Sequence, residues 1–108
     1  MQTIEKKING ELFDSVIIET KADDVVISHI DDNECIIKTN VTSTMDDEEL
    51  NHLVESGRYH VELGIKTRVL YIRYIKQDQT LINQPDYHEI VGLIILLPRG
   101  INYKHVKK

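Results

Sequence analysis

The sequence predicts a single, mainly β domain. Short segments rich in Val, Ile, Thr and Tyr recur along its 108 residues, and short polar runs separate them. A hydrophobic fraction of 41% and a charged fraction of 29% are typical of a globular chain and exclude a disordered or collagen-like one. We therefore expect one β-rich domain over residues 1–108, an antiparallel meander forming a two-layer sheet or a short solenoid-like stack, with one short helix near residues 46–56.

β-branched and aromatic residues dominate seven segments, which we expect to be strands. They are residues 12–20, 25–30, 35–41, 59–65, 69–75, 90–97 and 101–106. The polar connections at 21–24, 31–34 and 66–67 have the length that joins neighbouring antiparallel strands. This spacing predicts successive hairpins.

Two of these segments carry informative patterns. Between Tyr59 and Ile65 the odd-numbered residues are apolar and most of the others polar, which predicts a strand with one dry and one wet face. Residues 90–97 are apolar at both alternating sets of positions, apart from Gly92. We expect this segment to run through the middle of a sheet, at the centre of the core.

The helix is expected over residues 46–56, because Leu50, Leu53 and Val54 follow the i, i+3, i+4 spacing of a helical face. The acidic residues of its first turn suit the helix dipole and need no functional role. The residues that mark its ends are Thr44 or Asp46 as the N-cap and Gly57 just past the C-terminus.

Two connections after this point are expected to be irregular. Residues 77–86 are polar apart from Leu81 and Ile82, which predicts an exposed loop and the most mobile part of the chain. The run from Pro98 to Gly100 must end the strand that precedes it.

The charge balance excludes several classes of partner. Thirteen basic and eighteen acidic side chains give a formal net charge of −5, which disfavours attraction to nucleic-acid phosphates. The longest apolar run, 90–97, is far shorter than the roughly 20 residues that span a bilayer, so we expect no membrane insertion. The first residues lack the pattern of a signal peptide, and the single Cys35 cannot form an internal disulfide; as written, the chain is expected to be cytoplasmic.

No arrangement of residues predicts catalysis, and we expect neither a cofactor nor a metal. Cys35 lies among isoleucines without a nucleophile elbow or a glycine-rich oxyanion loop, so a buried, inert thiol is expected. The five glycines match no phosphate-binding motif. A metal-assisted hydrolase using His60 and Glu62, two residues apart on one strand face, is a less favoured alternative because a third ligand would have to come from another strand.

The sequence therefore favours a non-catalytic binding or assembly module. We expect partner contacts at two sets of residues, one aromatic and basic, one acidic: Tyr71, Arg73, Tyr74 and Tyr103, and Asp46, Asp47, Glu48 and Glu49. Self-association through strand 69–75 or strand 101–106 would cover sheet edges. The alternative from another class is a small acidic inhibitor that blocks a basic partner through the 46–49 cluster together with Asp23 and Asp24.

The order of short motifs resembles the bacterial putative adhesin family. The similar stretches are residues 13–20, 24–29, 34–39, 58–63, 69–72 and 97–106, the last opening on Leu97-Pro98-Arg99-Gly100. The resemblance implies an all-β fold of stacked strands, no catalytic residues, and a role at the cell envelope or in protein contacts. The chain departs from the family pattern because it has no export signal and stops where further Gly-Asp-containing repeats usually follow. It is thus expected to be either a short stand-alone relative or a piece of a longer protein, for which envelope association is expected.

Overall fold

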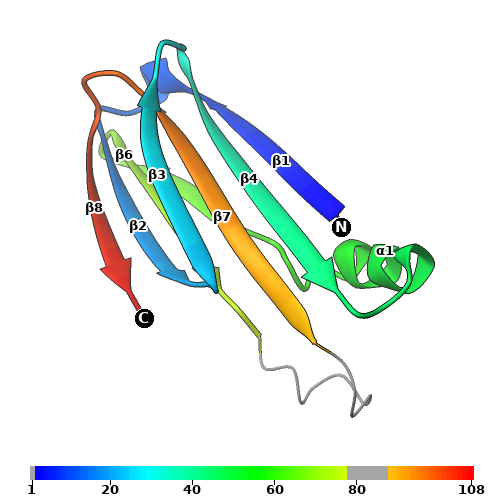
Figure 1. Cartoon of the computed structure of the whole chain (residues 1–108). Helices are drawn as coiled ribbons and strands as arrows, with labels where there is room; N and C mark the ends of the chain where they lie inside the picture. Colours follow the sequence, from blue (N-terminus) through cyan, green and yellow to red (C-terminus); the bar gives the residue numbers. More distant parts are fainter. Residues whose placement is uncertain (1, 78–87) are drawn as a thin grey trace.

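Eight strands and one α-helix make up the fold in the computed structural model, which describes residues 2–77 and 88–108 (Figure 1). In chain order the elements are β1 Gln2–Asn9, the 3-10 turn η1 Gly10–Leu12, β2 Ser15–Lys21, β3 Asp24–Ile30, β4 Glu34–Ser43, α1 Asp47–Glu55, β5 Glu62–Lys66, β6 Val69–Ile75, β7 Glu89–Pro98 and β8 Asn102–Lys107. The predicted loop 77–86 lies outside the described residues, apart from Gln77.

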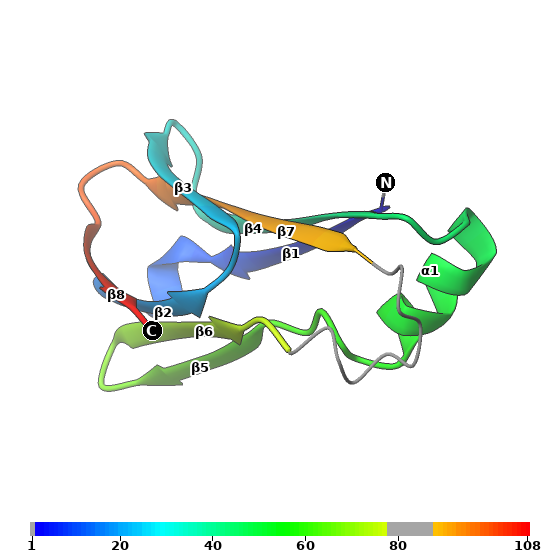
Figure 2. The same ribbon diagram turned by 60° about the horizontal axis from the view of Figure 1, so that its bottom comes forward.

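The strands form two four-stranded sheets. The first sheet has the order β1-β4-β7-β3 and the second sheet the order β5-β6-β2-β8. Figure 2 shows the two as separate layers, with α1 at one end. The predicted mainly β, two-layer architecture with one short helix is confirmed.

The predicted antiparallel meander is wrong, because both sheets are mixed. β2 pairs in parallel with β6 and with β8, and β3 pairs in parallel with β7. The connection 21–24 carries the chain from one sheet to the other, and β3 and β4 lie on either side of β7 instead of pairing with each other. A four-residue connection can close a hairpin or cross between layers, so its length alone does not decide which strands pair.

The one predicted hairpin that forms joins β5 to β6. Its two central residues, Thr67 and Arg68, have φ of 53° and 58°. Positive φ at both positions gives the turn that matches the right-handed twist of the flanking strands. The β6 bounds match the predicted segment 69–75.

One predicted segment is corrected, and one strand was not predicted. β5 begins only at Glu62, so Tyr59 and Val61 are buried on irregular backbone before the strand, while Ile65 within it is exposed. β1 was not expected, because Ile4 and Ile8 are its only large apolar residues. Its antiparallel pairing with β4 supplies the stability that its composition lacks.

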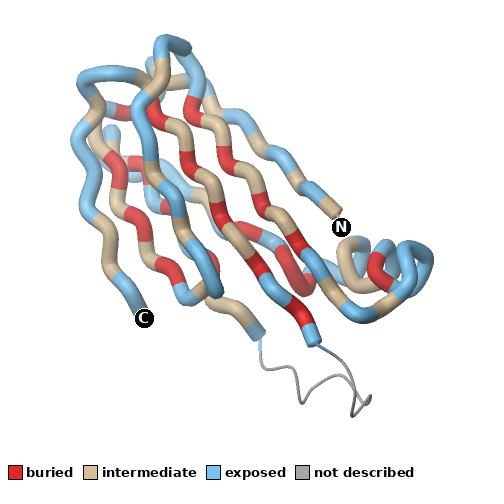
Figure 3. Tube along the Cα trace, in the orientation of Figure 1, coloured by how far each residue is buried: buried red, intermediate tan, exposed pale blue. Residues whose placement is uncertain are grey.

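The core lies between the sheets and follows the two-residue period of the strands. Figure 3 shows buried positions alternating along β4 and β7. β7 is an inner strand of the first sheet, as expected, and Val91, Leu93, Ile95 and Leu97 are fully buried. Its other face is only half-covered, since Ile94 and Leu96 are intermediate and Ile90 is 60% exposed. Each fully buried side chain of this size contributes about 1.5–3 kcal/mol relative to exposure.

Helix α1 has the ends that the sequence predicts. Asp46 is the N-cap, and its carboxylate accepts a hydrogen bond from the Glu49 amide at 2.8 Å. Leu50 is buried, and Gly57 has a φ of +86°, which glycine adopts without strain. Thr44 Oγ1 accepts a hydrogen bond from the His88 amide instead of capping the helix. At nine residues, α1 is too short to cross a membrane, and no other helix in the described residues is long enough.

Candidate functional site

The outer face of the second sheet carries two of the predicted contact residues, Tyr71 and Arg73. The strand register places Tyr71 between Ile17 and Gly64, and Arg73 between Glu19 and Glu62. Because side chains alternate along β6, Leu70, Ile72 and Tyr74 point into the core while Tyr71 and Arg73 point away from it. We define the Tyr71 face as these six positions: Ile17, Glu19, Glu62, Gly64, Tyr71 and Arg73.

A shallow hollow of about 310 Å³ lies on this face. It is open because Gly64 has no side chain, and a Cβ atom built there would meet nothing within 4 Å. Tyr71, opposite Gly64, is 43% exposed. An exposed aromatic ring beside an open hollow is the kind of feature on which protein contacts centre.

A row of alternating charges borders the hollow. The Arg73 guanidinium lies 3.3 Å from Glu19 and 3.5 Å from Glu62. Lys108 Nζ lies 2.6 Å from the other oxygen of Glu19, and its hydrogen bond holds the pKa of Glu19 below the usual range. Such exposed pairs add little to stability, so this row mainly fixes the orientation of the side chains beside Tyr71.

The remaining predicted contact residues lie elsewhere. Tyr74 is only 2% exposed, so its inclusion among the contact residues was wrong; the two-residue period of β6 turns it inward. Tyr103 lies on the edge strand β8, where its ring centroid is 5.9 Å from that of His29. Tyr103 is 43% exposed, but it pairs with the buried Val16 and so faces the inner side of its sheet.

The acidic cluster 46–49 is exposed at the start of α1, away from the Tyr71 face (Figure 1). Asp46 is engaged in capping the helix. The other acids of the inhibitor hypothesis lie at the β2–β3 connection, where Asp23 is paired with Lys76. The acids of this hypothesis therefore come from two separate elements, the start of α1 and the β2–β3 connection.

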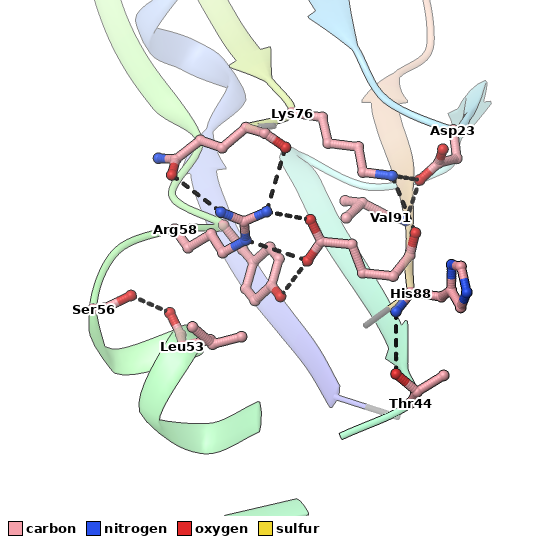
Figure 4. Close-up of polar contacts among 11 residues, drawn as sticks. Asp23, Thr44, Leu53, Ser56, Arg58, Lys76, His88 and Val91 are labelled. Carbon is pink, nitrogen blue, oxygen red and sulfur yellow. Dashed lines mark hydrogen bonds and ion pairs between the residues drawn. The ribbon is translucent and has the colours of Figure 1, made fainter. Parts of the chain in front are cut away.

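Sequence reasoning missed a buried polar cluster around Glu89 (Figure 4). Glu89 is 3% exposed and Arg58 is 7% exposed. Arg58 Nε donates to Glu89 Oε2 at 3.2 Å, its Nη2 donates to Oε1, and the Tyr59 hydroxyl donates to Oε2 at 2.7 Å. Burial opposes the charge on Arg58, but the Glu89 carboxylate outweighs it and holds the pKa of Arg58 above its usual range.

This cluster ties the segment after α1 to the first residue of β7. Arg58 also donates to the Gln77 side chain at 3.4 Å and to its carbonyl at 3.3 Å. Since Arg58 and Glu89 are 31 positions apart, no local pattern could have paired them. Buried charges that are fully paired in this way lock one arrangement of the chain, and we assign the cluster a structural role.

A second ion pair lies beside it. Asp23 Oδ2 accepts hydrogen bonds from Lys76 Nζ and from the Val91 amide, each at 2.7 Å, and Lys76 Nζ also donates to the Glu89 carbonyl at 3.1 Å. Burial raises the pKa of Asp23, but the hydrogen bonds from Lys76 and the Val91 amide have the larger combined effect, so the pKa of Asp23 is lowered. The Asp23–Lys76 pair therefore holds the β2–β3 connection against the start of β7.

The residues considered for metal binding and catalysis are directed to separate neighbours. His60 Nδ1 lies 3.1 Å from Lys6 Nζ, whereas Glu62 faces Arg73. Within residues 2–77 and 88–108, no group of three or more His, Cys, Asp or Glu side chains could hold a metal ion. Cys35 is fully buried, as expected, and burial raises the pKa of its thiol to about 11.

The fold and this surface define a two-sheet β-sandwich that presents a small aromatic and charged face. Its fold is adhesin-like: over 98% of the chain it is similar, with a TM-score of 0.60 and 8% sequence identity, to the crystal structure of a putative cell adhesion protein from Clostridium sporogenes. A putative adhesin from Bacteroides fragilis matches over 98% of the chain with a TM-score of 0.39 and 10% identity.

The chain spans 47% of the Clostridium protein and 41% of the Bacteroides protein, about half of each or less. No family model matches the sequence, and no curated protein does. The similarity to the Clostridium protein confirms the adhesin-like fold that the sequence motifs predict.

Proposed function

We propose that the chain is a non-catalytic protein-binding module and that the Tyr71 face is its contact surface. The observation that carries this proposal is the exposed Tyr71 ring beside the open hollow at Gly64. The description of the structurally similar Clostridium chain as a putative cell adhesion protein supports a binding role.

The chemistry of the face indicates what it would bind. The hollow fits one apolar side chain of a partner, packed against Tyr71 and Ile17. The flanking Arg73 and Glu62 are positioned to hydrogen-bond the polar groups on either side of that side chain, which gives specificity more than affinity. A protein segment with an isolated apolar residue between polar ones meets both requirements.

The test fills the hollow without disturbing the fold. Gly64→Leu puts a side chain into the open space, and Gly92→Leu is the matched control, because a Cβ atom at Gly92 in the first sheet also meets nothing within 4 Å. Peptides selected from a random displayed library on the wild-type chain are measured against both variants, with circular dichroism confirming the fold of each.

We expect the selected peptides to bind Gly64→Leu at least about tenfold more weakly than the wild type, which is roughly the effect of losing one well-packed apolar anchor. Their affinity for Gly92→Leu should equal that for the wild type. Peptides that bind Gly64→Leu as tightly as the wild type would reject the Tyr71 face as the contact surface.

A further inference from the structure

The two sheets end side by side in open strands. β3 is the last strand of the first sheet and β8 the last strand of the second, and no strand in the described parts of the chain pairs with the far edge of either. Figure 1 shows both on the same side of the sandwich, pointing in opposite directions. Because edge strands present unpaired backbone groups, this side of the molecule is a template for another strand.

The two edges are level with each other along their length. Asp24 at the start of β3 and Lys108 just after β8 line the same cleft. At the other end, the rings of His29 and Tyr103 lie 5.9 Å apart. The start of β3 thus lies at the height of the end of β8.

The edges carry opposite charges. Acidic residues flank and begin β3, whereas β8 and the residue after it are basic. The acids are Asp23, Asp24, Asp31 and Asp32, of which Asp23 and Asp31 are also paired within the chain with Lys76 and Arg99; the lysines are Lys104, Lys107 and Lys108, of which Lys108 is also paired with Glu19. Pairing β3 with β3 or β8 with β8 of another copy would bring like charges together, while pairing β3 with β8 brings opposite charges together.

We propose that the occupant of this side is a second copy of the chain, related by a two-fold axis parallel to the strands. This rotation keeps the strand direction and exchanges the two layers, so β3 of each copy meets β8 of the other in antiparallel orientation. Each first sheet then continues into the second sheet of its partner copy. The edges of both sheets on this side are then paired in both copies, so the contact forms a closed dimer and leaves no edge on this side for a third copy.

The register of the β3–β8 pair follows from the matching heights of the strand ends and from the face of the sheet on which each side chain lies. Val26 pairs with Ile94 on the outer face of the first sheet, and Val106 pairs with Glu19 on the outer face of the second. Asp24 of one copy therefore lies opposite Lys108 of the other, and Val26 opposite Val106. This pairing covers Val26, which is 46% exposed in the single chain.

Lysines on an edge strand commonly protect it against pairing, and here they act selectively. They oppose β8–β8 pairing, but the acids at β3 neutralise them in the β3–β8 arrangement. On each side of the sandwich a side chain bridges the two layers: Lys6 of β1 donates to the Val61 carbonyl at 3.2 Å, and His29 of β3 lies 2.7 Å from the Ile101 carbonyl. The charges of the edges therefore select the side. Dimerisation is thus directed to the β3–β8 side and leaves the Tyr71 face exposed for a partner.

Variants with one added cysteine test the register. In an antiparallel pair, opposite Cα atoms lie about 4.5–5.5 Å apart, within disulfide range. Val26→Cys and Val106→Cys are purified separately and mixed under mild oxidation, with the buried Cys35 retained. We expect a covalent dimer on mixing and none from either variant alone. Cross-linking of Val26→Cys with itself, or no cross-linking on mixing, would overturn the proposal.

A charge exchange tests the complementarity by light scattering of the eluted protein. The wild type is expected to be a dimer at concentrations near 100 μM or above, Asp24→Lys to weaken dimerisation at least about tenfold, and Asp24→Lys with Lys108→Glu to restore it. Glu5→Lys on β1 is the matched control and should leave the dimer unchanged. A strict monomer at every concentration would overturn the dimer while leaving the test of the Tyr71 face unaffected.

Discussion

The Tyr59 hydroxyl donates a 2.7 Å hydrogen bond to a Glu89 carboxylate that also binds Arg58. All three residues are buried, where an uncompensated charge is costly. Arg58 and Tyr59 follow the helix, and Glu89 begins the central strand β7. The cluster therefore joins the irregular segment after α1 to the start of an inner strand of the first sheet.

Removing the Glu89 carboxylate is expected to destabilise the fold severely. Glu89→Ala leaves Arg58 as a buried charge without its partner carboxylate, which costs about 3–5 kcal/mol of unfolding free energy. Glu62→Ala removes a carboxylate from an exposed pair and serves as the control, with an expected change within about 0.5 kcal/mol. Urea unfolding of the two variants measures both values. Equal changes would show that the Glu89 cluster contributes no more than a surface ion pair.

Asp23 is expected to make stability depend on acid pH. Its pKa is lowered from 3.8 in the folded chain, so its contribution is fully present above that value and is lost as the pH falls through the lower folded value. Asp23→Asn should flatten part of the fall in unfolding free energy between about pH 5 and pH 2. The measurement is urea unfolding across this range, with Asp24→Asn as the neighbouring control. If the Asp23→Asn curve parallels that of the wild type, the ion pair with Lys76 does not set this dependence.

The Cys35 thiol is expected to be unreactive in the folded chain. It is fully buried, and a pKa of about 11 leaves almost no thiolate at neutral pH. A thiol-specific reagent should modify it only after unfolding in urea, whereas the thiol of Leu12→Cys, at an exposed position outside the β3 and β8 edges, should react at once. Rapid modification of the folded wild type would contradict the placement of Cys35 in the core.

The two tyrosines of β6 are expected to differ in how strongly their truncation destabilises the fold. Tyr74 is buried, so Tyr74→Ala opens a cavity and should cost about 3–5 kcal/mol of unfolding free energy. Tyr71 is on the outer face, so Tyr71→Ala should cost less than about 1 kcal/mol. Thermal or urea unfolding separates the two; a larger loss at Tyr71 would reverse the assigned sides of β6.

The parts of the fold that sequence reasoning predicted are those set by nearby residues. α1 follows from the apolar spacing around Leu50, the Asp46 cap and Gly57. The β6 bounds follow from a run of β-branched and aromatic residues. Of the predicted contact residues on β6, Tyr71 and Arg73 lie on the outer face, whereas Tyr74 lies on the inner one; the alternation along 69–75 carries no polar marker at position 74 that would have shown this.

The amino-acid sequence by itself determined that the chain is built mainly from strands, where its helix lies, and that Cys35 is buried, because these properties depend on composition and on periods of two to four residues. Only the tertiary structure decided that β2 lies between β6 and β8, that β7 separates β3 from β4, and that Arg58 meets Glu89. The physical reason is that strand partners and buried ion pairs are chosen by the closure of the whole core. Short connections such as 21–24 are compatible with more than one closure.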